Sequence, residues 1–398
     1  MDPKWCSMPI EMMPANPSGN TFVLRRITRS DHLRSLVYIS SIYHCSHQNI
    51  LPTHKTNLLV LSHSPIKALN KIQSPTMPEI IDDKSQHCIP FLLERLQAHQ
   101  ARHPTNTPPF FLGLNGVQGA GKTVLVSTLQ STLRSPPYSL NVVTLSLDDL
   151  YLTHSQQEHL AASHPSNPLL QHRGQPGTHD LTLAKEVFSA LRAGQRTAVP
   201  AYDKSAVSGQ GDRVPASQWE VVNKEGEEKV KVVIFEGWCV GFRAWDEEVL
   251  KRKWEDAVRL KEAAAAGQGE YKGRLGHVEF EDVKTVNEAL RGYDVITDQL
   301  DALIHIDAQD LHFVYDWRQE QERTLRAAKG TGMTEEQVTK FVDGYYPSYE
   351  LFTETLRAGT FKPVPHATTA SAPPTGWEER QLRLVVDKNR RVQEVINI

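Results

Sequence analysis

Eight consecutive residues of the chain carry the pattern G-x-x-x-x-G-K-[ST], which is typical of a phosphate-binding loop. They are Gly116, Val117, Gln118, Gly119, Ala120, Gly121, Lys122 and Thr123. Glycines let backbone N–H groups curl around an oxyanion without obstruction by Cβ atoms, and a helix that starts in the loop points its positive end at the same phosphates. Lys122 is expected to reach the β- and γ-phosphates, and the Thr123 hydroxyl to bind Mg²⁺. The pattern therefore predicts ATP and Mg²⁺ as cofactors.

Acidic residues follow the next two apolar segments that predict strands. Asp148 and Asp149 come directly after "NVVTLSL", and Glu236 comes after "VVIF". A kinase needs a carboxylate to accept the proton of the acceptor hydroxyl, and Mg²⁺ needs oxygen ligands. Side chains alternate along a strand, so only one aspartate is expected to be the base, while the other is a candidate metal ligand with Thr123 and Glu236. The alternative for each acid is a cap on the following turn or helix.

Two loops offer polar groups for a small anionic acceptor. They read "QHRGQPGTHD" (171–180) and "PAYDKSAVSGQGDR" (200–213). Forked guanidinium donors suit planar oxyanions, and binding residues are often found on glycine-rich loops. Taken singly, each basic residue is more simply a surface charge, and the histidine is more readily a hydrogen-bonding group than a metal ligand. The candidate acceptor-binding residues are Arg173, His179, Asp180, Tyr202, Lys204 and Arg213.

A later segment with helical spacing, "VYDWRQEQERTLRAAKGTG" (314–332), carries several arginines. Kinases with a phosphate loop commonly close an arginine-bearing lid over the phosphates and so exclude water. Arg318 and Arg323 are therefore candidate catalytic residues that neutralise charge on the transferring group. The alternative is a solvated helix face in which Glu320 pairs with Arg323.

The spacing of apolar residues predicts the elements that position these groups. The predicted strands are 109–115, 141–149, 229–238, 301–308 and 381–391. Helical spacing at 122–134 and 181–194 separates several of them. Continuous apolar strands alternating with helices indicate an α/β fold of the P-loop NTPase type. We expect a mostly parallel sheet of about five strands covered by helices on both faces, with helical insertions and an arginine-bearing lid.

Composition limits the class of protein and its partners. The 398 residues are 39% hydrophobic and 23% charged, with a formal net charge of −3. This charge gives no reason to expect nucleic acid as a partner, and no apolar run is long enough to cross a membrane. The four cysteines lie far apart without a C-x-x-C pair, which favours a reducing compartment over a disulfide framework or a zinc site. The sequence does not fix the oligomeric state.

Residues 1–76 differ from the rest of the chain. Lys and Arg outnumber Asp and Glu there, and no sustained periodicity runs through the segment. Its composition suits either a low-order extension or an artefact of a start codon chosen too far upstream, which we favour together, or an organelle transit peptide. We therefore expect a kinase domain over 77–398. The expected location is cytoplasmic or nuclear, or mitochondrial if 1–76 is a transit peptide.

Several blocks occur in an order that makes the prediction more specific. "GLNGVQGAGKT", "SLDDLYLT", "RGQPGTHD", "PAYDKSAVSGQGDR" and "FEGW" follow one another along the chain. Together they resemble the D-glycerate 3-kinase family of plants and fungi, including its yeast ATP-dependent kinase relatives. That family is a branch of the uridine kinase, phosphoribulokinase and pantothenate kinase group, and the resemblance covers about residues 77–398. It implies transfer of the γ-phosphate of ATP to D-glycerate to give 3-phosphoglycerate, with Asp148 as the base.

Two other functions stay open at this stage. A kinase of the same fold could act on another hydroxyl metabolite, such as uridine, pantothenate or a sugar phosphate. A non-catalytic protein could keep the phosphate loop and respond to nucleotide without transferring phosphate. The intact acids at 148 and 236 and the arginines at 318 and 323 argue against the second alternative.

Overall fold

The computed structural model of the chain describes residues 82–362 and 378–398. The extension predicted over 1–76 and the start of the kinase domain predicted at residue 77 lie outside the described residues. All candidate site residues lie within them.

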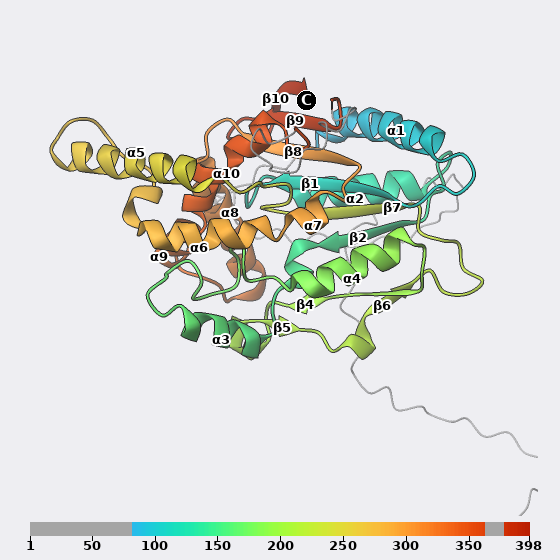
Figure 1. Ribbon diagram of the computed structural model, residues 1–398, viewed down its shortest axis with the longest axis horizontal. Helices are drawn as coiled ribbons and strands as arrows, with labels where there is room; N and C mark the ends of the chain where they lie inside the picture. Colours follow the sequence, from blue (N-terminus) through green and yellow to red (C-terminus); the bar gives the residue numbers. More distant parts are fainter. Residues whose placement is uncertain (1–81, 363–377) are drawn as a thin grey trace, which may run out of the picture. The chain divides into compact units, whose positions relative to one another are not determined.

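A six-stranded sheet forms the centre of the fold (Figure 1), with the strand order β10-β9-β8-β1-β7-β2. Its strands are β1 (Phe110–Gly116), β2 (Val142–Ser146), β7 (Val232–Gly237), β8 (Ala302–Ala308), β9 (Gln381–Val386) and β10 (Val392–Asn397). All neighbouring pairs are parallel except β9 and β10. The five predicted strands and the mostly parallel sheet are therefore confirmed. The sixth strand, β10, was not predicted, because its residues are half-buried or exposed at the sheet edge.

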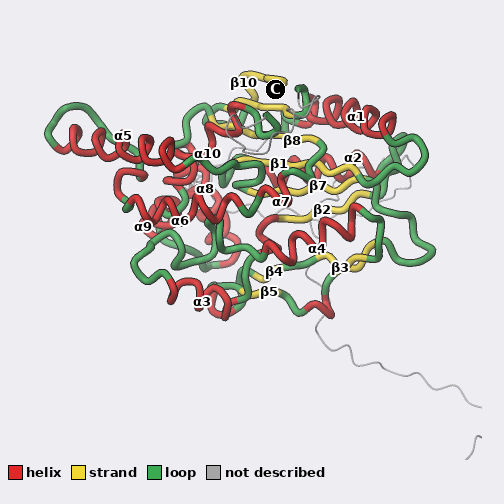
Figure 2. Tube along the Cα trace, in the orientation of Figure 1, coloured by secondary structure: helices red, strands yellow, loops and turns green. Residues whose placement is uncertain are grey.

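Helices cover both faces of this sheet, as Figure 2 shows by colour. On one face, α1 (Ser85–Arg102) places the His99 ring 5.4 Å from the ring of Phe110 in β1. On the other, α4 (Leu181–Arg192) places the Phe188 ring 5.2 Å from that of Phe111. Neighbouring side chains of a strand point to opposite faces, so α1 and α4 lie on opposite sides of β1. Every residue of β1 and β8 is accordingly buried, which explains why most of their residues are apolar.

The remaining elements surround this core. The other helices are α2 (Lys122–Arg134), α3 (His154–Ser163), α5 (Glu247–Ala265), α6 (Phe280–Arg291), α7 (Asp294–Thr297), α8 (Phe313–Lys329), α9 (Glu335–Asp343) and α10 (Tyr346–Ala358). Two small sheets pair β3 (Thr197–Val199) with β6 (Glu220–Val222) and β4 (Tyr202–Asp203) with β5 (Asp212–Arg213). Four 3₁₀ turns are η1 (Leu147–Leu150), η2 (Val207–Gly209), η3 (Ala216–Gln218) and η4 (Leu275–His277). The charged α5 is the predicted helical insertion and extends away from the sheet (Figure 1). No helix within the described residues is both long and apolar enough to span a membrane.

The parallel strands all end at one edge of the sheet. β1 ends at Gly116, β2 at Ser146 and β7 at Gly237, and the register pairs Ser146 with Glu236. Ligands of parallel α/β sheets bind outside the carboxyl ends of the strands. The fold thus brings the phosphate loop and the predicted acids to the same edge.

Candidate active site

The phosphate loop joins β1 to α2 in a conformation that requires glycine. Gly119 has φ +79° and Gly121, which precedes the first residue of α2, has φ +96°, both in the left-handed region. A Cβ atom on Gly119 would lie 2.5 Å from the Cβ of Trp317, which belongs to α8. Only a residue without a side chain can therefore occupy position 119 without moving α8.

Lys122 lies between the loop and the acids. Its Nζ donates to the Gly116 carbonyl at 2.8 Å and approaches the Val117 carbonyl at 3.5 Å. Burial lowers the pKa of the Lys122 ammonium, and the nearby Glu236 and Asp148 carboxylates oppose this shift. The predicted phosphate-binding cation is thus held at the loop and faces the predicted catalytic and metal-binding carboxylates.

The two neighbouring aspartates have different surroundings. Asp149 accepts a hydrogen bond from the Ser146 backbone N–H at Oδ2 and another from the Tyr202 backbone N–H at Oδ1, each at 3.2 Å. Both of its carboxylate oxygens therefore bind backbone groups. Asp148 instead places Oδ2 2.5 Å from Lys204 Nζ, with its side chain 26% exposed. Burial alone would raise the pKa of Asp148, but the Lys204 ammonium outweighs this effect and the pKa lies below its ordinary value. Asp148 is therefore ionised at neutral pH and accessible from solvent.

Two of the predicted metal ligands, Thr123 and Glu236, lie in the first turn of α2 and near the end of β7. The Ser146 hydroxyl donates to Glu236 Oε1 at 2.8 Å, which fixes the carboxylate at the end of β7. Thr123 is exposed in the first turn of α2. No cluster of three or more His, Cys, Asp or Glu that could hold a metal occurs in the described ranges. A site of one carboxylate and one hydroxyl fits Mg²⁺, which usually keeps several waters and binds substrate phosphates as well.

All three predicted acceptor-binding cations contact protein groups, and Arg173 and Arg213 do so between loops. The Arg173 guanidinium donates to the carbonyls of Gly209 and Gln210 in the β4–β5 loop. Arg213 donates to the Tyr151 carbonyl at 2.8 Å and pairs with Asp180 at 3.1 Å. These contacts hold the two predicted acceptor loops in place.

Asp180 and Lys204, the other charged candidates in these loops, differ in their contacts. Asp180 also caps α4 by accepting the Leu183 N–H at 2.9 Å, so it contributes to the local fold. Lys204, by contrast, is 59% exposed and lies against Asp148. Of the three predicted acceptor-binding cations, Lys204 is the only exposed one, and it lies beside the predicted base Asp148.

A group of stacked rings supports the region around Asp148. The His179 ring stacks on Tyr151 with 4.5 Å between centroids, and its Nδ1 lies 2.5 Å from the Tyr293 hydroxyl. Burial lowers the pKa of His179 to about 4, so it is neutral at pH 7. Tyr202 meets the edge of the Tyr151 ring at 5.3 Å between centroids, and the Tyr151 side chain helps to lower the pKa of Asp148. His179 and Tyr202 therefore position Tyr151, a residue that was not among the predicted site residues.

The two predicted lid arginines pair with glutamates of α8 and α9. Arg318 lies 3.0 Å from Glu322, and Arg323 lies 3.5 Å from Glu335. Arg323 does not pair with Glu320 as the alternative interpretation expected, because Glu320 binds Arg390. No hydrogen bond or ion pair among the described residues joins either lid arginine to the phosphate loop. Their catalytic role stays a prediction.

Two residues that contact the loop were not predicted. The Tyr349 hydroxyl of α10 lies 3.4 Å from the Gln118 nitrogen, and Arg390 donates to the Gly119 carbonyl. Tyr349 lies in a segment for which no site role was predicted, and Arg390 lies near the end of the predicted strand 381–391, in the turn that the structure shows between β9 and β10. Neither carries a local pattern that points to the loop, since both contacts join segments far apart in the chain.

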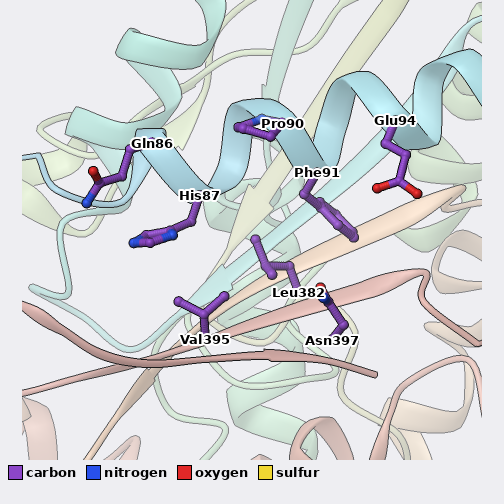
Figure 3. A pocket seen from close by; sticks show the side chains of 8 residues that line it. All are labelled: Gln86, His87, Pro90, Phe91, Glu94, Leu382, Val395 and Asn397. Atoms are coloured by element: carbon purple, nitrogen blue, oxygen red, sulfur yellow. The ribbon is translucent and has the colours of Figure 1, made fainter.

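A separate hollow of about 280 Å³ lies between α1 and strands β9 and β10 (Figure 3). Pro90 and Phe91 line it from α1, and Leu382 and Val395 from the strands. None of the candidate site residues lines it. It is distinct from the phosphate loop, and no step of the reaction is placed there.

The fold and the site together define the class of protein. A phosphate loop, an ionised aspartate at the end of the next strand and a carboxylate on the neighbouring strand are the parts of an ATP-dependent P-loop kinase. No protein-family model matches the sequence, but similar proteins exist. An uncharacterized kinase of Schizosaccharomyces pombe, mug58, is 40% identical over 250 residues, or 62% of this chain and 82% of the relative. A probable ATP-dependent kinase of Saccharomyces cerevisiae, TDA10, is 30% identical over 68% of this chain and 87% of its own length.

A solved structure narrows the class. D-glycerate 3-kinase from Cryptococcus neoformans superposes with a TM-score of 0.65 at 34% identity, covering 79% of this chain and 98% of the other. The chain therefore belongs to the D-glycerate 3-kinase family of P-loop kinases. It is an ATP-dependent phosphotransferase with an alcohol group as acceptor.

Proposed function

We propose that the protein transfers the γ-phosphate of ATP to D-glycerate and forms 3-phosphoglycerate. The observation that carries the proposal is the 2.5 Å approach of Lys204 Nζ to Asp148 Oδ2. A hydroxy acid needs a base for its hydroxyl and a cation for its carboxylate, and this pair supplies both at one place. The similarity to a solved D-glycerate 3-kinase supports the same acceptor.

The residues have the following roles in the proposed reaction. Backbone N–H groups of residues 119–123 and the Lys122 ammonium hold the β- and γ-phosphates of ATP. Thr123 and Glu236 would hold Mg²⁺, which neutralises charge on the phosphates when it is bound. Asp148 accepts the proton of the acceptor hydroxyl. The oxygen of that hydroxyl forms a bond to the γ-phosphorus, and the bond between the γ-phosphorus and the β,γ-bridging oxygen breaks, which releases ADP.

Lys204 has two partners in this scheme. While it pairs with Asp148, the base carries a close positive charge that lowers its proton affinity. An acceptor carboxylate offers Lys204 a second anion, so its binding draws the ammonium from Asp148. We therefore propose that Lys204 selects acceptors that carry a carboxylate next to the hydroxyl-bearing carbons.

Other candidate residues act indirectly in this proposal. Asp149, Arg173 and Arg213 position the η1 turn and the β4–β5 loop through the hydrogen bonds described above. We propose Asp149 as a positioning residue in place of the metal ligand expected from sequence, because its two oxygens already accept backbone N–H groups. Asp180 and His179 support the same region.

An acceptor panel tests the proposal. Purified protein with ATP and Mg²⁺ is offered D-glycerate, L-glycerate, glycerol, uridine, pantothenate and ribulose 5-phosphate, and ADP release is measured. We expect turnover with D-glycerate and little with glycerol, which lacks the carboxylate. Lys204→Met should reduce the preference for D-glycerate over glycerol. Turnover on uridine, pantothenate or ribulose 5-phosphate without turnover on D-glycerate would overturn the assignment.

We also propose a cytoplasmic location. Cys88 and Cys239 are buried and unpaired, which suits a reducing compartment. Mass spectrometry of the native N-terminus tests the alternative, because a cleaved transit peptide would remove part of residues 1–76.

A further inference from the structure

The turn between β9 and β10 contacts the phosphate loop through one arginine. Arg390 Nε donates to the Gly119 carbonyl at 2.7 Å. The two residues are 271 positions apart in the chain. The loop is thus held from outside its own strand and helix.

Arg390 is itself fixed by contacts with α8 and with the residue that precedes α1. Its Nη2 lies 2.9 Å from Glu320 of α8, and its guanidinium lies over the Trp317 ring at 5.3 Å from the centroid. Its own carbonyl accepts from the Nζ of Lys84, which precedes α1 and is 2% exposed, at 2.7 Å. An arginine held this way presents its Nε–H to Gly119 in one geometry.

These contacts argue against a direct role of Arg390 in binding phosphate. The side chain is 5% exposed and its charge is paired with Glu320. A phosphate-binding arginine needs free donors that point into the site, and breaking a buried pair to supply them is strongly unfavourable. Arg390 therefore acts on the loop and not on the ligand.

The held carbonyl belongs to the peptide bond between Gly119 and Ala120, in the glycine-rich part of the loop. Glycines allow the backbone to adopt both signs of φ, and residues 116–121 contain three of them. With the Gly119 carbonyl bound to Arg390 and the Ala120 N–H bound to the Val117 carbonyl at 3.2 Å, the plane of this peptide is fixed. Trp317 packs against Gly119 so closely that a Cβ there would lie 2.5 Å from the Trp317 Cβ. The N–H groups that follow, from Gly121 onward, then keep their direction before any nucleotide binds.

We propose that Arg390 is a positioning residue for nucleotide binding, which ties the β9–β10 turn and α8 to the peptide bond after Gly119. Through Glu320 and Trp317 the same contact joins the loop to the helix that carries the predicted lid arginine Arg318. The proposal rests on the kinase class and not on the identity of the acceptor.

Nucleotide-binding measurements test the proposal without an acceptor, so they can fail independently of the D-glycerate assignment. The variants are Arg390→Ala, Arg390→Lys and, as a matched control, Arg391→Ala. The Arg391 side chain makes no hydrogen bond or ion pair with the residues described. Isothermal titration with MgADP gives the dissociation constant, competition by adenosine reports binding without phosphates, and thermal unfolding checks the fold.

We expect Arg390→Ala to weaken MgADP binding about tenfold or more, the usual size for loss of a hydrogen bond to a charged group. Adenosine binding should change little, because adenosine lacks phosphates. Arg390→Lys should recover only part of the affinity for MgADP. An ammonium can donate to one of the two partners, but it cannot reach both Gly119 and Glu320 as the guanidinium does. Arg391→Ala should match the parent.

A folded Arg390→Ala protein that binds MgADP within about twofold of the parent overturns the proposal. Equal weakening of MgADP and adenosine also overturns it, because that pattern indicates a general loss of structure. If Arg390→Ala does not fold, Arg390→Lys decides. MgADP affinity equal to that of the parent refutes the proposal, and selective loss of MgADP affinity supports it.

Discussion

Substitution of the two neighbouring aspartates by asparagine should give opposite results. Asp148→Asn keeps the shape of the side chain but removes its ability to take a proton. Asp149→Asn replaces one of two acceptor oxygens with an NH₂ group, although both oxygens bind backbone N–H groups, of Ser146 and Tyr202. The first change therefore affects the chemistry, and the second affects the fold of the η1 turn.

The structure sets the size of each effect. General-base catalysis contributes roughly 10²–10⁴ in rate, so the kcat of Asp148→Asn should fall by about that factor. Its free energy of unfolding should change by at most about 1 kcal/mol, because the Lys204 side of the ion pair is 59% exposed. Asp149→Asn leaves one half-buried N–H without an acceptor, which costs up to about 1–3 kcal/mol of stability. Its activity should fall less than that of Asp148→Asn, because the base remains.

Two assays separate the outcomes. Urea unfolding followed by tryptophan fluorescence gives the free energy of unfolding, and ADP release at saturating ATP and acceptor gives kcat. MgADP titration checks that both variants still bind nucleotide. If Asp148→Asn retains more than about a tenth of the parent kcat, it falls outside the range for a lost general base. The assignment of the base would then be wrong. Equal stability of Asp149→Asn and the parent would contradict the structural role of Asp149.

Three further predictions follow from individual contacts. Lys204→Met should raise the KM for D-glycerate and move the acid limb of the kcat/KM profile to higher pH, because the cation that lowers the pKa of the base is gone; an unmoved limb would contradict the ion pair. Gly119→Ala should lower the free energy of unfolding by about 2–4 kcal/mol, since φ is +79° and Trp317 blocks the Cβ. Gly121→Ala, with φ +96° and open space, should lose only about 1–2 kcal/mol in the same urea titration; equal losses would refute the clash. Burial lowers the pKa of His179 from 6.5 to about 4, so the unfolded chain takes up a proton first as pH falls. The contribution of His179 to the free energy of unfolding is complete above about pH 6.5 and should fall by about 2 kcal/mol at pH 5. Urea unfolding at both pH values should show this loss in the parent and not in His179→Phe.

The fold and the phosphate loop could be predicted because their signals are local. The pattern at 116–123 encodes a backbone shape, and the apolar runs encode strands that are buried on both faces. The ends of parallel strands meet at one edge, so Asp148 and Glu236 could be assigned to the nucleotide side before the structure was known. Each of these inferences uses a few neighbouring residues and a general rule.

The partners of the arginines could not be predicted in this way. Arg173, Arg213 and Arg390 cannot be told apart by the residues around them, since nothing adjacent in the sequence indicates what each guanidinium binds. The structure distinguishes these arginines by their hydrogen-bond partners. Each binds a backbone carbonyl, and Arg213 and Arg390 also bind a carboxylate. Those partners lie at least 31 residues away along the chain. Strand β10 was missed for a related reason, because an exposed edge strand depends on pairing with β9 more than on its own apolar pattern.

Phosphorus NMR of the reaction mixture tests the proposed reaction most directly. The purified chain is incubated with ATP, Mg²⁺ and D-glycerate, and an Asp148→Asn sample serves as the control. We predict that ADP and 3-phosphoglycerate appear in equal amounts with the parent chain, and that neither accumulates at a comparable rate with the variant. A phosphorylated product at another position, or ADP formed with free phosphate and no 3-phosphoglycerate, would contradict the proposed transfer.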